Sequence, residues 1–244
     1  MEPMDIYITS WKRPQFTEQT INMFHERTKP GTFKIHVLDN ESDDRTQAVL
    51  LKCLQDKRIE SLLLHNVNTK CLWGKAVYHA MTNSNQPYYI VSDNDVHPPK
   101  MEGKDWLERL TETMEAQREL AFLTAQLPPV QFQSPYEKNG DVVYCKAVGN
   151  TLKVVRRSAF PFGLYEQNMT SYGDDSMVCD LVHEKGWKVA YHKEVFCWHA
   201  GQTENWGYEP DEIDKDPRKA GYGAPYKYTP VDADTFESPA DLQV

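Results

Sequence analysis

The stretch Tyr88-Tyr89-Ile90-Val91-Ser92-Asp93-Asn94-Asp95 joins an apolar run to two carboxylates that stand one residue apart. The apolar run predicts a buried β-strand, and the polar residues after it predict a turn at the carboxyl end of that strand. Two carboxylates in that place can face a hard cation such as Mg²⁺ or Mn²⁺, which prefers oxygen ligands and leaves coordination positions for substrate phosphates. The same pattern also occurs in solvated turns, so the pair alone does not establish a metal site.

Strand-like and helix-like segments alternate on both sides of this stretch, up to about residue 126. The expected strands are 5–9, 34–38, 59–65, 88–92 and 121–126, and the expected helices are 13–26, 44–56, 72–83 and 106–118. This rhythm of continuous apolar strands and helices predicts an α/β fold whose mostly parallel central sheet is flanked by helices. Ligands of such sheets bind at the carboxyl ends of strands, where the polar residues after positions 9, 38 and 92 would gather.

The alternation loosens after residue 126. The expected elements there are a β-ribbon at 142–146, a strand at 151–156, a helix at 172–184 and two short strands at 188–191 and 194–198. From residue 207 onward the chain is rich in Pro, Gly, Tyr and charged residues, with little periodicity. This composition predicts an irregular C-terminal tail or lid.

The overall charge and the cysteines argue against a protein whose whole surface binds polyanions and against a disulfide-rich protein. Lys and Arg number 27 and Asp and Glu 36, which gives a net charge of −9 and argues against a surface devoted to nucleic acid or anionic lipid. The 5 cysteines are widely spaced without a C-x-x-C pair, which fits a reducing compartment. No basic leader and no apolar run of roughly 20 residues is visible. We therefore expect a cytoplasmic protein without a membrane span, and no obligatory protein partner is evident.

Two further polar clusters carry potential chemistry. Asp174 and Asp175 lie in the first turn of the helix expected at 172–184, where carboxylates either complement the helix dipole or, if one faces a hydroxyl, provide a general base. His199 follows an apolar run at 195–198. Such a histidine is usually packed or hydrogen-bonded, but a neutral imidazole could also complete a metal site begun by Asp95. The residues themselves leave both alternatives open.

Taken in order, these clusters resemble the motifs of GT-A nucleotide-sugar transferases, specifically the inverting family 2 glycosyltransferases. The matching stretches are IYITSWKRP (6–14), VLDNESDD (37–44), GKA (74–76), YIVSDND (89–95) and GDD (173–175). Each stretch is a loose match, but five in order are more specific than any one. The resemblance covers about residues 5–200. It implies a GT-A fold with a mostly parallel sheet and a smaller acceptor-side β-ribbon.

The resemblance also implies an organisation of the chain and roles for single residues. It implies one catalytic domain over 1–206, with a nucleotide-sugar-binding half at 1–100, an acceptor-binding half at 101–206, and the tail at 207–244. The implied donor site consists of Thr9, Trp11, Arg13, Asp39, Lys75, Asp93 and Asn94. Within it, Asp39 would read the nucleobase, and Asp93 would contact the ribose or the metal, with the ribose favoured.

The remaining implied roles concern the metal, the catalytic base and the acceptor. Asp95 and His199 would hold Mn²⁺ or Mg²⁺. Asp175 would be the catalytic base and Asp174 the acid before it, although the family's usual Glu-Asp pair is Asp-Asp here, which leaves the choice between them open. The acceptor would meet Gly149 and Asn150. Independently of the resemblance, Trp206 is a candidate to stack on a sugar or a base, with anchoring of the tail as the alternative.

The expected activity is a metal-dependent, inverting hexosyl or pentosyl transfer from a nucleotide sugar, expected to be UDP-linked, to an acceptor hydroxyl. The acceptor stays open between a glycan and a hydroxymethylated DNA base. The second option would use a local basic face made by Lys12, Arg13, Lys153, Arg156 and Arg157.

Two other functional classes compete with sugar transfer. A nucleotidyltransferase of related fold normally has a Gly-rich basic loop near its start, and residues 10–14 contain no Gly. A non-catalytic sugar- or nucleotide-binding module would be favoured if Asp95, Asp174 or Asp175 were missing, and all are present.

Overall fold

The structure is a computed structural model, and it describes residues 2–66, 76, 80, 81, 83–127, 135–160 and 174–200. Within these ranges the strands are β1 (Met4–Ser10), β2 (Phe33–Asn40), β3 (Ser61–His65), β4 (Tyr88–Asp93), β5 (Val96–His97), β6 (Leu120–Gln126), β7 (Pro135–Asn139), β8 (Val142–Cys145), β9 (Lys153–Arg156), β10 (Lys188–Phe196) and β11 (Trp198–His199). The helices are α1 (Pro14–Arg27), α2 (Asp44–Gln55), α4 (Trp106–Ala116) and α6 (Asp174–Glu184), with a short 3-10 helix η2 at Arg157–Ala159.

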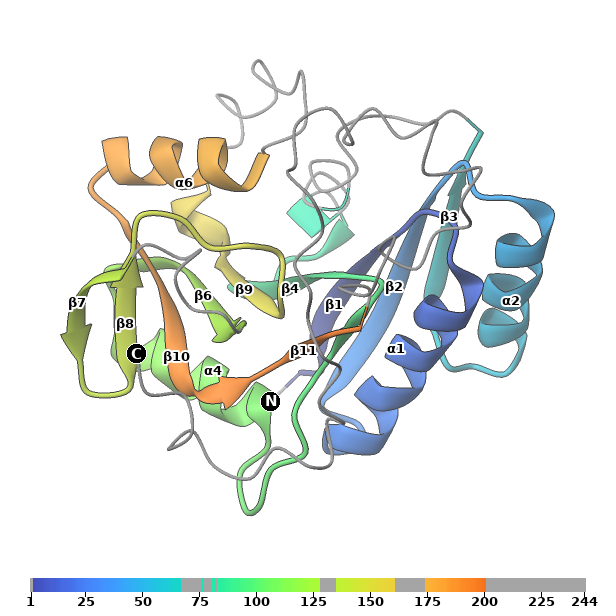
Figure 1. Cartoon of the computed structure of the whole chain (residues 1–244), viewed down its shortest axis with the longest axis horizontal. Coiled ribbons are helices and arrows are strands. Elements are labelled where there is room, and N and C mark those ends of the chain that lie inside the picture. The colour runs from blue at the N-terminus through green and yellow to red at the C-terminus, as the bar shows by residue number, and fades with distance from the viewer. Residues whose placement is uncertain are drawn as a thin grey trace.

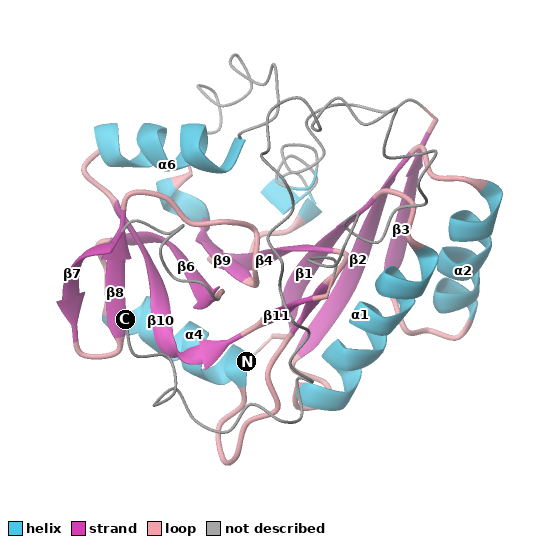
Figure 2. Cartoon of the chain, in the orientation of Figure 1, coloured by secondary structure: helices cyan, strands magenta, loops and turns pink. Residues whose placement is uncertain are grey.

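A mixed, largely parallel sheet runs through the described part of the molecule (Figures 1 and 2). Its strand order is β3-β2-β1-β4-β9-β6-β10-β8-β7. Strands β3, β2, β1 and β4 are parallel neighbours, and β6 and β10 form another parallel pair. Strand β9 runs antiparallel between β4 and β6, and β8 and β7 complete the sheet as an antiparallel ribbon. The predicted α/β architecture, with a largely parallel region of the sheet and a β-ribbon, is confirmed.

Local sequence signals explain where the helices on one side of the sheet begin. Pro14 opens α1, where its fixed φ and missing N–H donor are favourable. The Asp43 side chain accepts a hydrogen bond from the Thr46 N–H at 2.8 Å and so caps α2. Asp105 and Glu108 form a reciprocal capping box at the start of α4.

Helices cover both faces of the sheet (Figure 1). Apolar side chains of α1, α2 and α4 pack on one face, where Phe24 and Trp106 meet edge-on with ring centroids 5.5 Å apart. On the other face, Val178 and Val182 of α6 pack in one cluster with Tyr89 and Val91 of β4. Because successive residues of β4 alternate between the two faces, Asp93 shares the α6 face with Tyr89 and Val91.

Most of the expected elements are confirmed to within a few residues, and three differences matter. The two strands expected at 188–191 and 194–198 are wrong, since a single strand β10 spans most of both ranges. Its register against β6 shifts between His192 and Phe196, so the expected break is an irregularity in the pairing of one continuous strand. The second difference is that the two-residue strands β5 and β11 pair with each other, which the sequence did not predict.

The third point is that some of the expected elements lie partly or wholly outside the described residues. Of the expected helix at 72–83, only residues 76, 80, 81 and 83 are described, and these are helical. The expected tail at 207–244 lies outside the described residues. No helix in the described part of the chain has the length and apolar character needed to cross a membrane.

Candidate active site

The carboxyl ends of β1, β2 and β4 bring several predicted residues to one edge of the sheet. In the strand register, Thr9 stands beside Asp93, and Ser10 stands beside Asp39. The Thr9 hydroxyl donates to Asp93 Oδ1 at 3.5 Å. The gathering of polar strand ends that parallel topology predicts is therefore present.

The β5–β11 pair brings His199 next to Asp95, although 104 positions separate them in the sequence. The Ala200 N–H donates to the Asp95 carbonyl at 2.7 Å, which fixes the backbone after β11 against the turn after β4. The His199 Nε2 lies 2.9 Å from Asp95 Oδ1, and the Asp95 side chain is 2% exposed. The two residues predicted to hold the metal are thus in direct contact.

Asp93, Asp95 and His199 together form a group that fits a divalent cation. One ligand atom from each lies within 4.8 Å of the other two. Ligands about 2.1 Å from Mg²⁺ are at most roughly 4.2 Å apart, so small side-chain rotations would let all three reach one ion. Two carboxylates and an imidazole also suit Mn²⁺. The geometry thus supports the metal alternative for Asp93 beside its predicted contact with the ribose.

Arg13 supplies a positive charge to this acidic group. Its guanidinium donates from one nitrogen to Asp95 Oδ2 and from another to Asn94 Oδ1, each at 2.6 Å. The Asn94 side-chain amide in turn donates to the Thr17 hydroxyl at 2.8 Å, which fixes the orientation of the amide. Arg13 itself has a left-handed backbone, with φ 56°, at the N-cap of α1. A left-handed backbone is uncommon for a residue other than glycine. Here it occurs at the residue that both precedes α1 and places its guanidinium against the turn after β4.

The charges in the cluster shift the pKa values of its members in opposite directions. Burial, together with the neighbouring Asp95 and Asp175 carboxylates, raises the pKa of Asp93 to about 7. Burial acts in the same direction on Asp95, but Arg13 and His199 outweigh it and hold the pKa of Asp95 well below its ordinary value. For His199, burial lowers the pKa, and the Asp95 carboxylate raises it above the ordinary value. A cation placed between the carboxylates would relieve the repulsion that acts on Asp93.

The Asp39 carboxylate is held rigidly at the end of β2. Its Oδ1 accepts from the Ser42 hydroxyl at 2.5 Å, and its Oδ2 accepts from the Ser42 N–H at 3.0 Å. The Ser42 Oγ also accepts from the Lys12 N–H at 2.6 Å, which connects this pocket to the loop before α1. Burial raises the pKa of Asp39, and the hydrogen bonds from Ser42 partly oppose that rise. Ser42 belongs to one of the matching stretches, but its role in fixing Asp39 was not predicted.

Asp175 and the loop before β9 border the same edge of the sheet. The Asp175 carboxylate is 41% exposed at the start of α6, and its Oδ2 lies 3.9 Å from the position that a Cβ on Gly149 would take. The Asn150 carbonyl accepts from the Asp93 N–H at 3.1 Å. The predicted base and two predicted acceptor-binding residues therefore adjoin the acidic cluster. Asp174 is helical, but its side chain lies outside the described residues.

For three other predicted site residues, the structure does not test the predicted contacts with donor or acceptor. Trp11 is half-buried, and the Lys12 Nζ lies 5.5 Å from the centroid of its ring. Lys75 and Trp206 lie outside the described residues. Their predicted contacts with the donor and the acceptor stay predictions.

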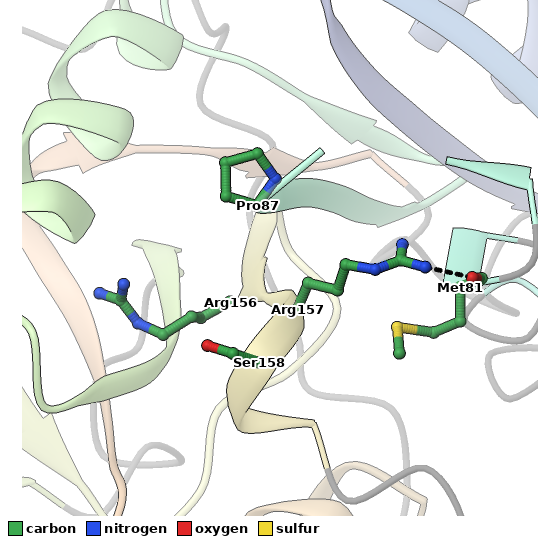
Figure 3. Close-up of a pocket in the computed structure, with 5 residues that line it drawn as sticks. All are labelled: Met81, Pro87, Arg156, Arg157 and Ser158. Atoms are coloured by element: carbon green, nitrogen blue, oxygen red, sulfur yellow. Dashed lines mark hydrogen bonds between the residues drawn. The ribbon is translucent and has the colours of Figure 1, made fainter. Parts of the chain in front are cut away.

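Of the local basic face expected from Lys12, Arg13, Lys153, Arg156 and Arg157, the structure excludes Lys153. The Lys153 side chain is wholly buried, so it cannot contribute to a surface. The Arg156 guanidinium donates to the main-chain carbonyls of Met114, Gln117 and Leu120 and to the Tyr88 hydroxyl. Arg157 likewise donates to the main-chain carbonyls of Ala80 and Met81, the second of which is drawn in Figure 3. Both guanidinium groups are thus held by the protein itself, although Arg156 and Arg157 are only half-buried.

These arginines line a cavity of about 380 Å³. Figure 3 draws its lining residues. Its lining residues are Met81, Pro87, Arg156, Arg157 and Ser158. None of these described lining residues is a predicted site residue. The cavity is therefore distinct from the edge of the sheet that carries the acidic cluster.

Comparison with known proteins agrees with this arrangement. The sequence matches the profile of Glycosyl transferase family 2 over residues 5–157. A search of curated protein sequences finds no significant match.

Similar solved structures are glycosyltransferases or complexes with nucleotides. One is GalNAc-T7 with UDP, GalNAc and Mn²⁺, at 10% identity and TM-score 0.60, with 82% of this chain and 44% of that chain covered. Another is the mannosyltransferase PcManGT from Pyrobaculum calidifontis with GDP-Man and Mn²⁺, at 12% identity and TM-score 0.59, with coverage of 87% and 64%. S. aureus TarS 1-349 with UDP has 12% identity and TM-score 0.56, with coverage of 90% and 74%. This chain thus spans less than two thirds of each of the first two proteins, and at these identities the likeness shows the fold.

Proposed function

Because the chain belongs to glycosyl transferase family 2, we propose that it transfers a sugar from a nucleotide sugar to an acceptor hydroxyl. We infer that the reaction depends on Mn²⁺ or Mg²⁺ and inverts the configuration of the anomeric carbon. The observation that carries the proposal is the convergence of Asp93, Asp95 and His199 at the sheet edge where Asp39 and Asp175 also lie. Nucleotidyl transfer, the other enzyme class considered, receives no support from the matching family.

The proposed metal ligands are Asp95 and His199, with Asp93 close enough to join them. The bound cation would neutralise charge on the diphosphate of the donor, which lowers the energy of the departing nucleotide. Arg13 lies on the other oxygen of Asp95 and adds a second positive charge near the same place. These groups act on charge that grows during transfer, so they would stabilise the transition state more than the bound donor.

Asp39 supports the choice of a uridine nucleotide. Two hydrogen bonds from Ser42 hold its carboxylate in one orientation, and a carboxylate has acceptor sites for more than two donors. A carboxylate accepts from the N3–H of uracil, whereas cytosine has an acceptor at that position. Guanine also presents an N–H there, but UDP accompanies two of the three similar structures described above, and we propose UDP-linked donors.

Asp175 is the proposed general base. In the transfer step, the oxygen of the acceptor hydroxyl forms a bond to the anomeric carbon while the bond from that carbon to the diphosphate oxygen breaks. The proton of the hydroxyl passes to the Asp175 carboxylate. Attack from the face opposite the diphosphate inverts the anomeric configuration. The partly exposed position of Asp175 supports this role, since an acceptor must reach it from solvent.

The acceptor is proposed only as a class of hydroxyl compound that approaches along Gly149 and Asn150. A glycan is the better candidate, because Lys153 is buried and so does not contribute to the basic face on which the DNA alternative relied. The division into a nucleotide-binding half (1–100) and an acceptor-binding half (101–206) belongs to the same proposal.

Release of nucleoside diphosphate tests the proposal directly. The protein is incubated with UDP-glucose, UDP-galactose, UDP-N-acetylglucosamine or GDP-mannose, with Mn²⁺ or with excess chelator, and with water or a mixed glycan pool as acceptor. We expect UDP release from at least one UDP-sugar, and we expect the chelator to abolish it. Failure to release a nucleoside diphosphate from any of these donors would refute the proposed function.

A further inference from the structure

Lys153 is a wholly buried lysine in the middle of the sheet. It begins β9 and pairs in register with Val91 of β4, two residues before Asp93. Its side chain lies on the α6 face, with Nζ 5.4 Å from the centroid of the Phe122 ring. Lysines are almost never fully buried unless they are paired, so this position calls for a physical reason.

The ion pair of Lys153 with Asp175 provides that reason. The Lys153 Nζ lies 3.2 Å from Asp175 Oδ1. The two partners differ sharply in exposure, since the lysine side chain is 0% exposed and the aspartate side chain is 41% exposed. Removing an ammonium group from water is costly, and a carboxylate and an aromatic face offset part of that cost. The lysine is thus anchored in the core, and the carboxylate that it holds reaches the surface.

Packing alone does not require a charge at this position. The neighbours of Lys153 on the α6 face include Phe122, Val155 and Cys179, so an apolar side chain of similar volume would suit them. Replacement of buried ion pairs by apolar residues is often neutral or stabilising. The ammonium group is therefore better explained by what it does to Asp175 than by what it adds to the core.

The ion pair also distinguishes the two oxygens of Asp175. Lys153 holds Oδ1, whereas Oδ2 lies on the side of Gly149, 3.9 Å from the position of a Cβ built there. The next residue, Asn150, accepts the backbone N–H of Asp93 through its carbonyl. The oxygen that Lys153 leaves available thus adjoins the loop that connects to the acidic cluster.

We propose that Lys153 is a positioning residue for the general base, which holds Asp175 Oδ1 so that Oδ2 is presented to the acceptor hydroxyl. This inference rests on the proposed function. During transfer the proton of the hydroxyl passes to Oδ2 as the acceptor oxygen bonds to the anomeric carbon and the diphosphate leaves. Lys153 keeps its protons throughout and touches neither the donor nor the acceptor.

The test compares Lys153→Met with Lys153→Arg, and with Lys185→Met as the matched control on an exposed lysine just after α6. The assay measures UDP release from the UDP-sugar that the unsubstituted protein uses, as kcat and as KM for the donor. A displacement of about 1 Å can cost roughly 100-fold in rate, so we expect Lys153→Met to lower kcat by about 10- to 100-fold. The donor KM and the Kd for UDP with Mn²⁺ should stay unchanged, and Lys153→Arg should recover part of kcat.

A double variant shows whether Lys153 acts through Asp175. In the background of Asp175→Asn, we expect Lys153→Met to cause no further loss of kcat. The effects of substituting two residues that act as a unit do not add. A folded Lys153→Met protein with unchanged kcat would overturn the inference. If Lys153→Met does not fold, Lys153→Gln takes its place. We expect a loss of kcat in that variant too, and an unchanged kcat would likewise overturn the inference.

The design separates failure of this inference from failure of the proposed function. Loss of activity in Asp175→Asn with full activity in Lys153→Met would refute only the positioning role. Full activity in Asp175→Asn would refute the assignment of the base, and the inference would fall with it. A uniform rise in donor KM without loss of kcat in Lys153→Met would also contradict the proposal, because it would place Lys153 in donor binding.

Discussion

The substitution Asp95→Asn removes one negative charge at the centre of the proposed metal site and keeps the shape of the side chain. Asp95 is almost wholly buried, and its two oxygens contact the Arg13 guanidinium at 2.6 Å and the His199 imidazole at 2.9 Å. An amide can keep part of this hydrogen bonding, but it leaves the Arg13 charge without its carboxylate. The same change removes the carboxylate that Mn²⁺ would bind.

The structure allows both effects to be given a magnitude. The Arg13 side chain is only 10% exposed, so the pair counts as buried, and the loss of one partner of a buried pair costs about 3 kcal/mol or more. For a domain of this size, 1 kcal/mol shifts Tm by roughly 2–4 °C, so we expect Tm to fall by about 6–12 °C. In the unsubstituted protein, Mn²⁺ at about 100 times its Kd should add about 2.7 kcal/mol of stability. Asp95→Asn should lose most of that gain.

Thermal unfolding with and without Mn²⁺ measures both quantities in one assay. Asp180→Asn is the matched control, because Asp180 is an exposed aspartate on α6. We expect the control to keep the Tm and the Mn²⁺-induced shift of the unsubstituted protein. The reasoning would be refuted by an Asp95→Asn protein whose Tm is unchanged and whose response to Mn²⁺ is as large as that of the control.

Three further predictions concern the base, the nucleobase pocket and a helix cap. Asp175→Asn should leave the Kd for UDP with Mn²⁺ unchanged and lower kcat for UDP release by about 100-fold or more, and a kcat equal to that of Asp180→Asn would contradict the role of Asp175. Ser42→Ala removes a hydrogen bond from the buried Asp39, so calorimetry should show weaker UDP binding by about 1 kcal/mol, and unchanged affinity would argue against this pocket. Asp43→Ala should lower the free energy of unfolding by about 1 kcal/mol at pH 7. Although burial raises the pKa of Asp43, its hydrogen bonds at the start of α2 lower it overall, so this contribution is present above the ordinary value of 3.8 and should be lost as the pH falls further. A difference from the unsubstituted protein that persists under acid would contradict the capping role.

Much of the fold follows from local rules that can be read in the sequence. The apolar run of β4 ends in a polar turn, and the structure places that turn at the carboxyl edge of a parallel region of the sheet. Asp43 and Asp105 occupy positions where a side chain caps the next helix, so α2 and α4 begin where capping chemistry predicts. The prediction of two strands in place of β10 is wrong, because the register against β6 shifts within β10 without ending the strand.

The details of the candidate site depend on contacts that no local pattern contains. His199 meets Asp95 only because β11 pairs with β5 across more than a hundred residues of sequence. The reach of Arg13 to Asp95 depends on left-handed backbone conformations at Lys12 and Arg13, which are uncommon for residues other than glycine. Lys153 was read as part of an exposed basic face because lysine is usually on the surface. Its burial beside Asp175 results from strand order, since β9 lies between β4 and β6 and faces α6.

The most direct test of the metal-dependent donor site is a crystal structure of the protein with UDP and Mn²⁺, with anomalous diffraction to locate manganese. The account predicts one strong anomalous peak within bonding distance of Asp95 and His199, with the diphosphate of UDP on its open side and the uracil ring at Asp39. A manganese peak away from Asp95 and His199, or UDP bound away from the carboxyl ends of β1, β2 and β4, would contradict it.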